Sequence, residues 1–225
     1  CYPMTPSDSP FLEVYTRLFK AFGPQHWWPA DSPFEVMVGT ILTQNTSWIN
    51  VEKAILELKR HPFGAQAVFE LDDDELAERI RSAGYYNVKT RRLKAFLGYY
   101  LEQYGGDLEA MRRSPPCQLR DELLSVNGIG DETADCILLY ALNMPSFVID
   151  AYTRRIFGRL GMLDAEAAYE DLQAKISNSI PQDVELFNEY HALIVVLGKD
   201  TCRPRPRCKS CPLTGMCSFS KSGRS

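Results

Sequence analysis

The 225-residue sequence predicts an all-α fold built from many short helices. Apolar residues recur at spacings of three and four along most of the chain, which places them on one face of a helix. No run alternates apolar and polar residues for long enough to indicate a β-strand. Prolines, glycines and asparagines interrupt the helical pattern at short intervals, so the connections are expected to be tight turns.

The helices follow one another from the N-terminus with little intervening chain. Over Pro10–Phe22 the residues Phe11, Val14 and Leu18 share one helical face. A second helix is expected to begin at Pro33, because proline suits the first helical position. The later helices are expected at residues 50–59, 74–82, 88–104, 119–125, 131–142, 152–160, 165–179 and 184–197.

The composition is that of an ordinary globular protein, with 45% hydrophobic and 24% charged residues. The length suits one large domain or two small ones. No stretch approaches 18 consecutive apolar residues, and no leader peptide is visible, so neither a membrane span nor secretion is expected. The seven cysteines therefore favour a metal site or buried thiols over a disulfide framework.

The charge is unevenly distributed along the chain. The net charge is only −4, but the segment from Lys199 to Ser225 carries +6, which leaves −10 for the remainder. This asymmetry indicates a basic surface on a mildly acidic body. A solvated tail would show the same pattern, so charge alone does not decide between the two readings.

A glycine hairpin lies between two of the expected helices, at Val126–Gly130. Gly128 and Gly130 permit positive φ and the close approach of another backbone. The next helix would begin at Asp131, and free backbone N–H groups at such a helix start bind phosphate, helped by the helix dipole. A clamp of this kind holds the DNA backbone without reading the base sequence. The alternative is an ordinary corner between two helices.

A single acidic residue, Asp150, follows an apolar run and opens the next helix. Aspartate is a good N-cap, which gives Asp150 a structural role. Burial beside apolar neighbours would also raise its pKa and suit it to act as a base or as a stabiliser of positive charge. Both roles are open at this point.

Four cysteines cluster near the C-terminus with the spacing C-x5-C-x2-C-x5-C, at Cys202, Cys208, Cys211 and Cys217. Four thiolates in a short loop rich in proline and basic residues indicate a bound metal centre. Zinc sites usually arrive as two C-x2-C pairs, whereas this loop has one pair flanked by single cysteines. The spacing therefore favours a four-iron cluster over zinc.

Together these motifs resemble the helix-hairpin-helix DNA glycosylases of the endonuclease III type, over roughly Pro33 to Cys217. The segments that carry the resemblance are Leu42–Thr46, Gly84–Lys89, Val126–Ala134, Val148–Asp150 and the four cysteines. The resemblance implies two helical lobes with a DNA-binding cleft between them. One lobe would comprise residues 1–32 and 145–225, with an iron–sulfur loop at 199–220. The other would comprise residues 33–144, with the helix-hairpin-helix at about 119–142.

The resemblance also implies roles for individual residues. Gly128 and Gly130 match the glycines that hold a DNA phosphate, and Asp150 matches the catalytic aspartate. Gln44 matches the residue that fills the gap left by a flipped base. The matching cluster ligands, which would hold a 4Fe-4S cofactor, are Cys202, Cys208, Cys211 and Cys217. Their first spacing is one residue shorter than the usual endonuclease III pattern.

One position departs from the bifunctional members of this family. They carry a lysine two residues after the second hairpin glycine, and its amine attacks the sugar and leads to strand cleavage. Here that position is Glu132, and a carboxylate cannot form an imine. The sequence therefore predicts a monofunctional glycosylase. The alternatives are a glycosylase/lyase on oxidised pyrimidines that uses another amine, and a non-catalytic protein that senses DNA damage.

Three tryptophans point to the substrate. Trp27, Trp28 and Trp48 stand in segments that resemble a bacterial branch of 3-methyladenine DNA glycosylases. Alkylated purines are electron-poor and often cationic, so aromatic faces bind them by stacking and cation–π attraction. Core packing is the alternative role for these tryptophans. His191 lies in an apolar helix and is expected to be a core histidine.

The remaining expectations concern partners. Arg203, Arg205 and Arg207 flank the cysteine loop and are expected to contact DNA phosphates. The resemblance implies a double-stranded DNA partner that contains a damaged base. The protein is expected to be a monomer, to bind no membrane, and to reside in a bacterial cytoplasm with the nucleoid.

Overall fold

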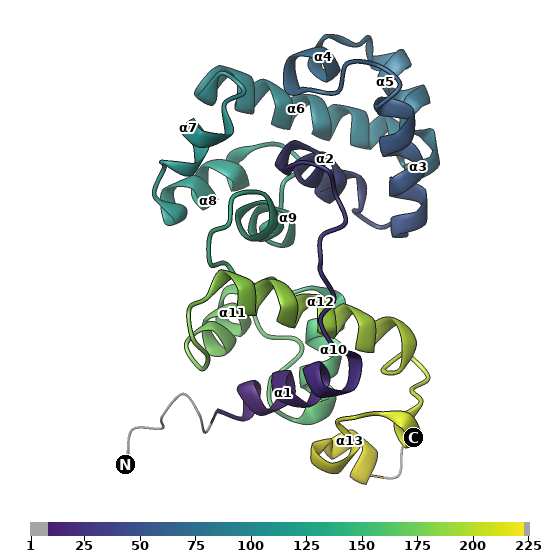
Figure 1. Ribbon diagram of the computed structural model, residues 1–225, viewed down its shortest axis with the longest axis vertical. Coiled ribbons are helices and arrows are strands. Elements are labelled where there is room, and N and C mark those ends of the chain that lie inside the picture. The colour runs from purple at the N-terminus through teal and green to yellow at the C-terminus, as the bar shows by residue number, and fades with distance from the viewer. Residues whose placement is uncertain (1–8, 223–225) are drawn as a thin grey trace. The chain divides into compact units, whose positions relative to one another are not determined.

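The computed structural model describes residues 9–222, and every regular element in that range is helical, which confirms the all-α prediction. The described chain divides into two compact units (Figure 1). The middle unit is Trp28–Met144, and the terminal unit combines the residues up to Trp27 with those from Pro145 onward. None of the helices in the described part of the chain combines the length and hydrophobicity that a membrane span requires.

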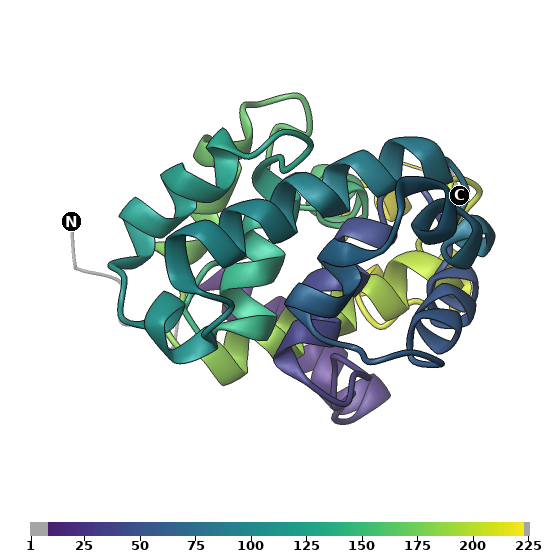
Figure 2. The same ribbon diagram turned by 90° about the horizontal axis from the view of Figure 1, so that it is seen from above.

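The middle unit is a bundle of short helices around one long helix, α6 (Tyr86–Tyr104), which runs across the unit in Figure 2. Its other elements are α2 (Pro33–Leu42), α3 (Trp48–Leu58), α4 (Ala65–Glu70), α5 (Asp73–Arg79), the 3₁₀ helix η2 (Arg81–Ala83), α7 (Leu108–Arg112), α8 (Pro116–Ser125), α9 (Asp131–Cys136) and the π-helical segment η3 (Ile137–Ala141).

Helix α2 lies at the centre of the middle unit because its sequence is apolar on every side. All its residues from Glu35 to Leu42 are buried, and α3, α6, α9 and η3 pack around it. The Ser32 side chain caps its first turn by accepting from the Glu35 backbone N–H at 3.2 Å. The Glu35 carboxylate is itself buried and pairs with Lys59 at 2.5 Å.

Four helices of the middle unit differ from the sequence-based prediction. The helix expected at 74–82 ends at Arg79 and continues as η2, and the helix expected at 131–142 changes from α to π geometry after Cys136. Helices α4 and α7 were not predicted, because each is so short that the apolar period is not visible. Each buries a single side chain, Val68 in α4 and Met111 in α7.

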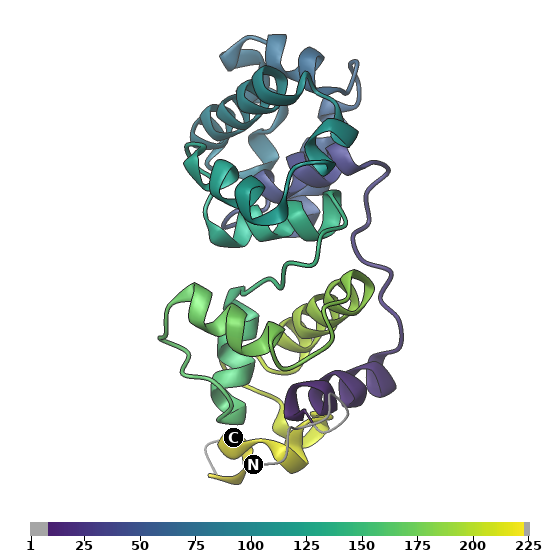
Figure 3. The same ribbon diagram turned by 90° about the vertical axis from the view of Figure 1, so that its left-hand side faces the viewer.

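The terminal unit joins two distant parts of the chain. Its elements are α1 (Pro10–Phe22), α10 (Ala151–Leu160), α11 (Tyr169–Ser177), α12 (Val184–Asp200), the 3₁₀ helices η4 (Cys208–Ser210) and η5 (Thr214–Met216), and α13 (Ser218–Lys221). Helix α12 packs against both α1 and α10 (Figure 3). Tyr190 on α12 is fully buried and donates its hydroxyl to the Phe11 carbonyl at 2.6 Å, which ties the N-terminal helix to the C-terminal segment.

The contact between α10 and α12 depends on a glycine. A Cβ atom at Gly198 would lie 2.3 Å from the Tyr152 ring, so only glycine lets the two helices approach this closely. Helix α11 is shorter than the helix expected at 165–179, because residues 165–168 form turns. This packing places the start of α10, the end of α12 and the cysteine loop in one unit.

Candidate functional site

The glycine hairpin joins α8 to α9 in the middle unit, and its two glycines serve different purposes. Gly128 has φ +89°, and a Cβ atom there would lie 2.2 Å from Arg92 Cγ. Gly130 has an extended backbone, with φ −103°, and a Cβ atom there would meet nothing within 4 Å. The sequence permits positive φ at both glycines, but only Gly128 adopts it.

Helix α9 begins immediately after Gly130, and no side chain caps its first turn. The first N–H groups of a helix have no acceptor within the helix, and the positive end of the dipole lies there. Glu132 is exposed in this first turn, two residues after Gly130. The turn therefore presents a carboxylate beside a glycine that leaves space for an incoming group.

A buried ion pair holds the two helices of the hairpin together. Arg120 on α8 donates to Asp135 Oδ1 at 2.9 Å and to Asp131 Oδ1 at 2.8 Å. The Asp135 side chain is fully buried, and Arg120 is itself mostly covered. Burial alone would lower the pKa of Arg120. The two carboxylates raise the pKa by more than burial lowers it, so the guanidinium is charged at any ordinary pH.

Gln44 lies against the hairpin. It follows α2, and its amide nitrogen donates to the Gly128 carbonyl at 3.0 Å and to Thr133 Oγ1 at 2.9 Å. Its amide oxygen accepts from Arg92 Nη1. The structure thus brings together three of the residues that the resemblance singles out, namely Gln44, Gly128 and Gly130, and adds Arg92, which the sequence did not reveal.

Asp150 is the N-cap of α10 in the terminal unit. Its Oδ1 accepts from the Thr153 backbone N–H at 2.6 Å and from the Thr153 hydroxyl at 2.7 Å. Its Oδ2 lies 3.6 Å from His191 Nε2 on α12, and both side chains are buried. The core histidine expected from the sequence therefore faces the aspartate.

The environment of Asp150 keeps its carboxylate ionised. Burial on its own would raise the pKa, but His191 and the two bonds from Thr153 outweigh it and hold the pKa of Asp150 below its ordinary value. The apolar sequence before Asp150 predicted a raised pKa for this carboxyl group, and that prediction is wrong, because the pKa is lowered. The Asp150 carboxylate therefore caps α10 and carries a buried negative charge at the same time.

An aromatic cluster forms in the middle unit. The Trp28 ring lies 5.2 Å from the Trp48 ring, nearly perpendicular to it at 86°, and 5.2 Å from the Tyr140 ring. Tyr140 belongs to the π-helical segment η3, and π turns shift the faces on which later side chains point. That shift explains why the sequence pattern did not reveal Tyr140. Trp27 is half-buried and belongs to the terminal unit.

The start of α6 holds two further residues, Tyr85 at its N-cap and Lys89 in its first turns, to which the sequence assigned no individual role. Tyr85 is 72% exposed and has a left-handed backbone with φ +46°, a strained conformation for a bulky residue. Lys89 is buried and donates from Nζ to the Leu42 carbonyl at 2.8 Å and to the Ala83 carbonyl at 2.7 Å. Burial and the nearby Arg92 lower the pKa of Lys89 to about 8.

The four C-terminal cysteines line one small pocket, together with Arg159 and Phe219. Burial raises the pKa of the Cys211 thiol, and the three neighbouring thiols raise it further, so a cation in the pocket would offset an existing cost. Across residues 9–222, no group of three or more His, Cys, Asp or Glu side chains is arranged to hold a single metal ion.

Two arginines of α10 anchor the cysteine loop. Arg155 donates to the Cys202 carbonyl at 2.8 Å, and Arg159 donates to Cys202 Sγ at 3.3 Å and to the Arg203 carbonyl at 2.7 Å. The helix that Asp150 caps therefore also holds the cysteine loop. In that loop the side chains of Arg203, Arg205 and Arg207 are exposed.

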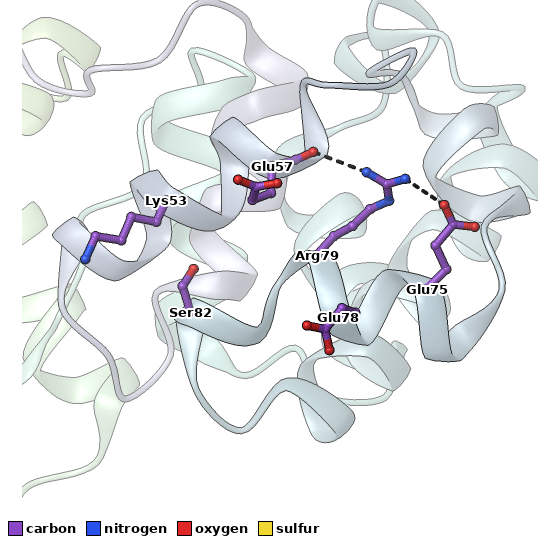
Figure 4. A pocket seen from close by; sticks show the side chains of 6 residues that line it. All are labelled: Lys53, Glu57, Glu75, Glu78, Arg79 and Ser82. Atoms are coloured by element: carbon purple, nitrogen blue, oxygen red, sulfur yellow. Dashed lines mark hydrogen bonds and ion pairs between the residues drawn. The ribbon is translucent and has the colours of Figure 1, made fainter.

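A surface pocket of the middle unit contains none of the expected site residues (Figure 4). Arg79 lies between two glutamates in this pocket, and it pairs with the Glu75 carboxylate at 2.6 Å and donates to the Glu57 carbonyl at 3.4 Å. The Arg79 guanidinium is therefore already engaged by groups of the pocket itself.

Comparison with known proteins accords with this arrangement. Residues 38–182 match the family described as "HhH-GPD superfamily base excision DNA repair protein". The chain is 46% identical to a protein named "Putative DNA repair glycosylase" from Methanocaldococcus jannaschii, over 91% of the chain and 94% of the relative. It is 28% identical to endonuclease III from Thermotoga maritima, over 92% of each chain.

Solved structures share the fold. An endonuclease III in a non-covalent complex with DNA superimposes with a TM-score of 0.83 at 23% identity, covering 99% of each chain. A 3-methyladenine DNA glycosylase from H. pylori, bound to 1,N6-ethenoadenine, superimposes with a TM-score of 0.75 at 27% identity. That match covers 84% of this chain and 97% of the other.

Proposed function

The chain belongs to the HhH-GPD superfamily of base excision DNA repair proteins and is a DNA glycosylase, and from this premise we propose that it releases a damaged base by hydrolysis alone. The observation that carries the proposal is the pair of carboxylates. Asp150 is buried and held ionised, whereas Glu132 occupies the position at which strand-cleaving relatives carry an amine.

Asp150 supplies the charge that the reaction requires. As the N-glycosidic bond breaks, the bonding electrons leave with the base, and positive charge develops on the sugar. A fixed carboxylate stabilises that charge at no cost in reorganisation, because Thr153 already holds one of its oxygens. A water molecule then attacks C1′, loses a proton and completes an abasic site. The base must first leave the helical stack.

The hairpin holds the DNA backbone in this proposal. The N-cap of α9 is Gly130, which has no side chain to accept from the first N–H groups and leaves room for a phosphate oxygen beside them. The exposed side chains of Arg203, Arg205 and Arg207 contribute further phosphate contacts. The exposed ring of Tyr85 supplies an aromatic face on which a DNA base can stack.

The chemistry of two residues supports the proposal that the strand is not cleaved. Glu132 has no amine with which to attack C1′. Lys89 has an amine with a lowered pKa, but it is 1% exposed and donates to two backbone carbonyls. Neither residue therefore forms the imine on which a lyase depends.

We propose an alkylated purine, such as 3-methyladenine, as the substrate. The perpendicular rings of Trp28 and Trp48, with Tyr140 beside them, offer aromatic faces to an electron-poor base. The H. pylori glycosylase of similar fold is named for 3-methyladenine and was solved with an alkylated adenine derivative. Trp27, which is half-buried in the terminal unit, is a separate candidate for stacking on the base.

A base-release screen over alkylated, oxidised and mismatched duplexes tests the proposal. Methylated purines should be released, and the product strand should remain intact until it is treated with alkali. Borohydride should trap no covalent complex. A wild-type protein that nicks its product and is trapped by borohydride would contradict hydrolysis alone, and mapping the crosslink would identify the amine.

The second candidate is a glycosylase and lyase on oxidised pyrimidines. The cysteine loop and the similarity to endonuclease III from Thermotoga maritima favour it. The same screen separates the two candidates, because oxidised pyrimidines would then be released and the strand would be cut without alkali.

We further propose that Cys202, Cys208, Cys211 and Cys217 hold a 4Fe-4S cluster. The four thiols line one pocket, and a 4Fe-4S cluster takes one cysteine on each of its four irons. Purified protein should be brown and should contain iron and acid-labile sulfide. A colourless protein with one equivalent of zinc would contradict this assignment.

A further inference from the structure

Arg92 connects α6 to both parts of the hairpin network. Its Nη1 donates to Gln44 Oε1, and its aliphatic stem lies against Gly128, where a Cβ atom would come within 2.2 Å of Cγ. Gln44 in turn donates to the Gly128 carbonyl at 3.0 Å and to Thr133 Oγ1 at 2.9 Å. One arginine therefore supports the hairpin directly and through the glutamine.

The Gln44 amide has no choice of orientation in this network. Its two N–H bonds point to the Gly128 carbonyl and the Thr133 hydroxyl, both of which accept, and its oxygen faces a guanidinium, which only donates. A flipped amide would set its N–H groups against the guanidinium and its oxygen against a carbonyl. Arg92 thus decides which end of the amide meets the hairpin.

The Gly128 carbonyl belongs to the peptide that leads from the hairpin turn toward Gly130. Rotation of that peptide would redirect the backbone groups next to Gly130. The Gln44 bond restrains the rotation, and Gly128, with φ +89°, is the residue whose backbone would otherwise move most freely. Rigid presentation of the hairpin lowers the entropy cost of binding a phosphate.

From this geometry we propose that Arg92 is a positioning residue. It orients Gln44 and holds the hairpin in its phosphate-binding form, rather than contributing a phosphate contact of its own. The inference rests on the proposed function, since it assumes that the hairpin binds DNA. Arg91, the adjacent residue on α6, is exposed and carries the same charge, so it serves as a matched control.

A double-mutant cycle between Arg92 and Gln44 tests this role. Arg92→Met keeps the aliphatic stem over Gly128 and removes the guanidinium, and Gln44→Met keeps the length of the side chain and removes its hydrogen bonds. The measurement is Kd for a duplex that contains a stable abasic-site analogue, at one fixed salt concentration. This readout requires no base release, so it tests the network even if the proposed reaction is wrong.

Each single variant should weaken binding by about tenfold, and the double variant should weaken it by about tenfold as well, rather than about a hundredfold. Arg91→Met should weaken binding by less than about threefold, because it removes charge alone. Losses that multiply in the double variant, or an Arg92→Met effect equal to that of Arg91→Met, would overturn the inference.

Arg92→Lys tests whether the positive charge alone is sufficient or whether the bond to Gln44 is required, and it should leave the packing against Gly128 intact. Lysine retains the stem and the positive charge but does not reach the Gln44 oxygen in the same geometry. Weakening close to that of Arg92→Met, with an unchanged melting temperature, supports the positioning role. Wild-type affinity in Arg92→Lys would overturn it, because charge would then be sufficient.

Discussion

Helices α9 and α10 begin in opposite ways, although both starts lie in the segments that resemble known glycosylases. The first turn of α10 is closed by Asp150, whose carboxylate accepts from Thr153 and is buried. The first turn of α9 follows Gly130 and has no side-chain cap. Both helix starts present positive dipole ends, yet only at α10 does the N-cap side chain accept from the first turn.

The difference shows how one physical feature serves two purposes. At α10 the helix start holds an internal carboxylate in its charged form, which suits a group that must stabilise positive charge. In the function proposed above, the same feature at α9 receives a DNA phosphate, and side chains from other elements hold the hairpin and α9 in place. Arg120 on α8 bonds to Asp131 and Asp135 on α9, and Gln44 bonds to the Gly128 carbonyl.

The largest expected effect comes from removing the charge at α10 while keeping the cap. Asparagine is also a good N-cap residue, so Asp150→Asn keeps the cap. Apart from what the lost His191 contact costs, the free energy of unfolding at neutral pH should change by no more than about 1 kcal/mol. Base release should fall by at least about 100-fold, because the developing positive charge loses its partner. Single-turnover release assays and thermal unfolding measure the two quantities.

Base release by Asp150→Asn at the wild-type rate would show that the charge at the start of α10 has no role in the reaction. Asp150 would then be a cap and nothing more. Asp150→Ala serves as the matched variant, since it removes the cap and the charge together and should lose stability as well as activity.

The two hairpin glycines should separate folding from binding. Gly128→Ala introduces a Cβ atom 2.2 Å from Arg92 Cγ at φ +89°, and it should destabilise the fold by about 2–3 kcal/mol. Gly130→Ala places its Cβ atom in open space, so its melting temperature should match the wild type. Its affinity for DNA should nevertheless fall, because the methyl group occupies the space left for a phosphate.

Equal affinities of Gly130→Ala and the wild type would show that the open start of α9 does not receive the backbone. Isothermal titration with an abasic-site duplex, run beside the melting experiment, distinguishes these results.

Lys89, on α6, places its ammonium group at the C-terminal end of another helix, α2, and tests how a buried cation there affects stability. Its ammonium group donates to the Leu42 carbonyl at the end of α2, and burial lowers its pKa from 10.5 to about 8. Because the unfolded chain binds more protons than the folded chain between these values, the contribution of Lys89 to stability should rise as the pH increases from about 8 to 10.5. We expect a gain of about 3 kcal/mol, absent from Lys89→Met and measured by urea unfolding at each pH.

A contribution that falls over this interval would mean that Lys89 is stabilised in its charged form. The two carbonyls would then compensate fully for burial, and the sign of the pKa shift would be wrong.

The smallest effect is expected from the basic loop of the terminal unit. Replacing Arg203, Arg205 and Arg207 with glutamine should flatten the dependence of DNA affinity on salt, by about 0.9 log units per log salt for each phosphate contact that is lost. Base release at saturating enzyme should change little, because these side chains neutralise phosphates and do not touch the reacting atoms. An unchanged slope would show that the loop does not contact DNA.

The sequence by itself determined the helical class, the hairpin with its glycines, the grouping of four cysteines and the replacement of an amine by Glu132. These features are local, since they depend on the helical period, on backbone freedom at glycine and on residue chemistry at short spacing. The position of Asp150 at a helix start is local in the same sense, because an N-cap bonds to a residue three positions later.

Only the tertiary structure decided which distant side chains meet. The contact between Asp150 at the start of α10 and His191 on α12, together with the bonds from Thr153, lowers the pKa of Asp150, which the sequence predicted to be raised. The bond from Arg92 to Gln44 joins residues 48 positions apart. Tyr140 reaches Trp28 through a π turn that the apolar period does not reveal. Such contacts depend on how whole helices pack, and the pattern within any one helix carries no record of its neighbours.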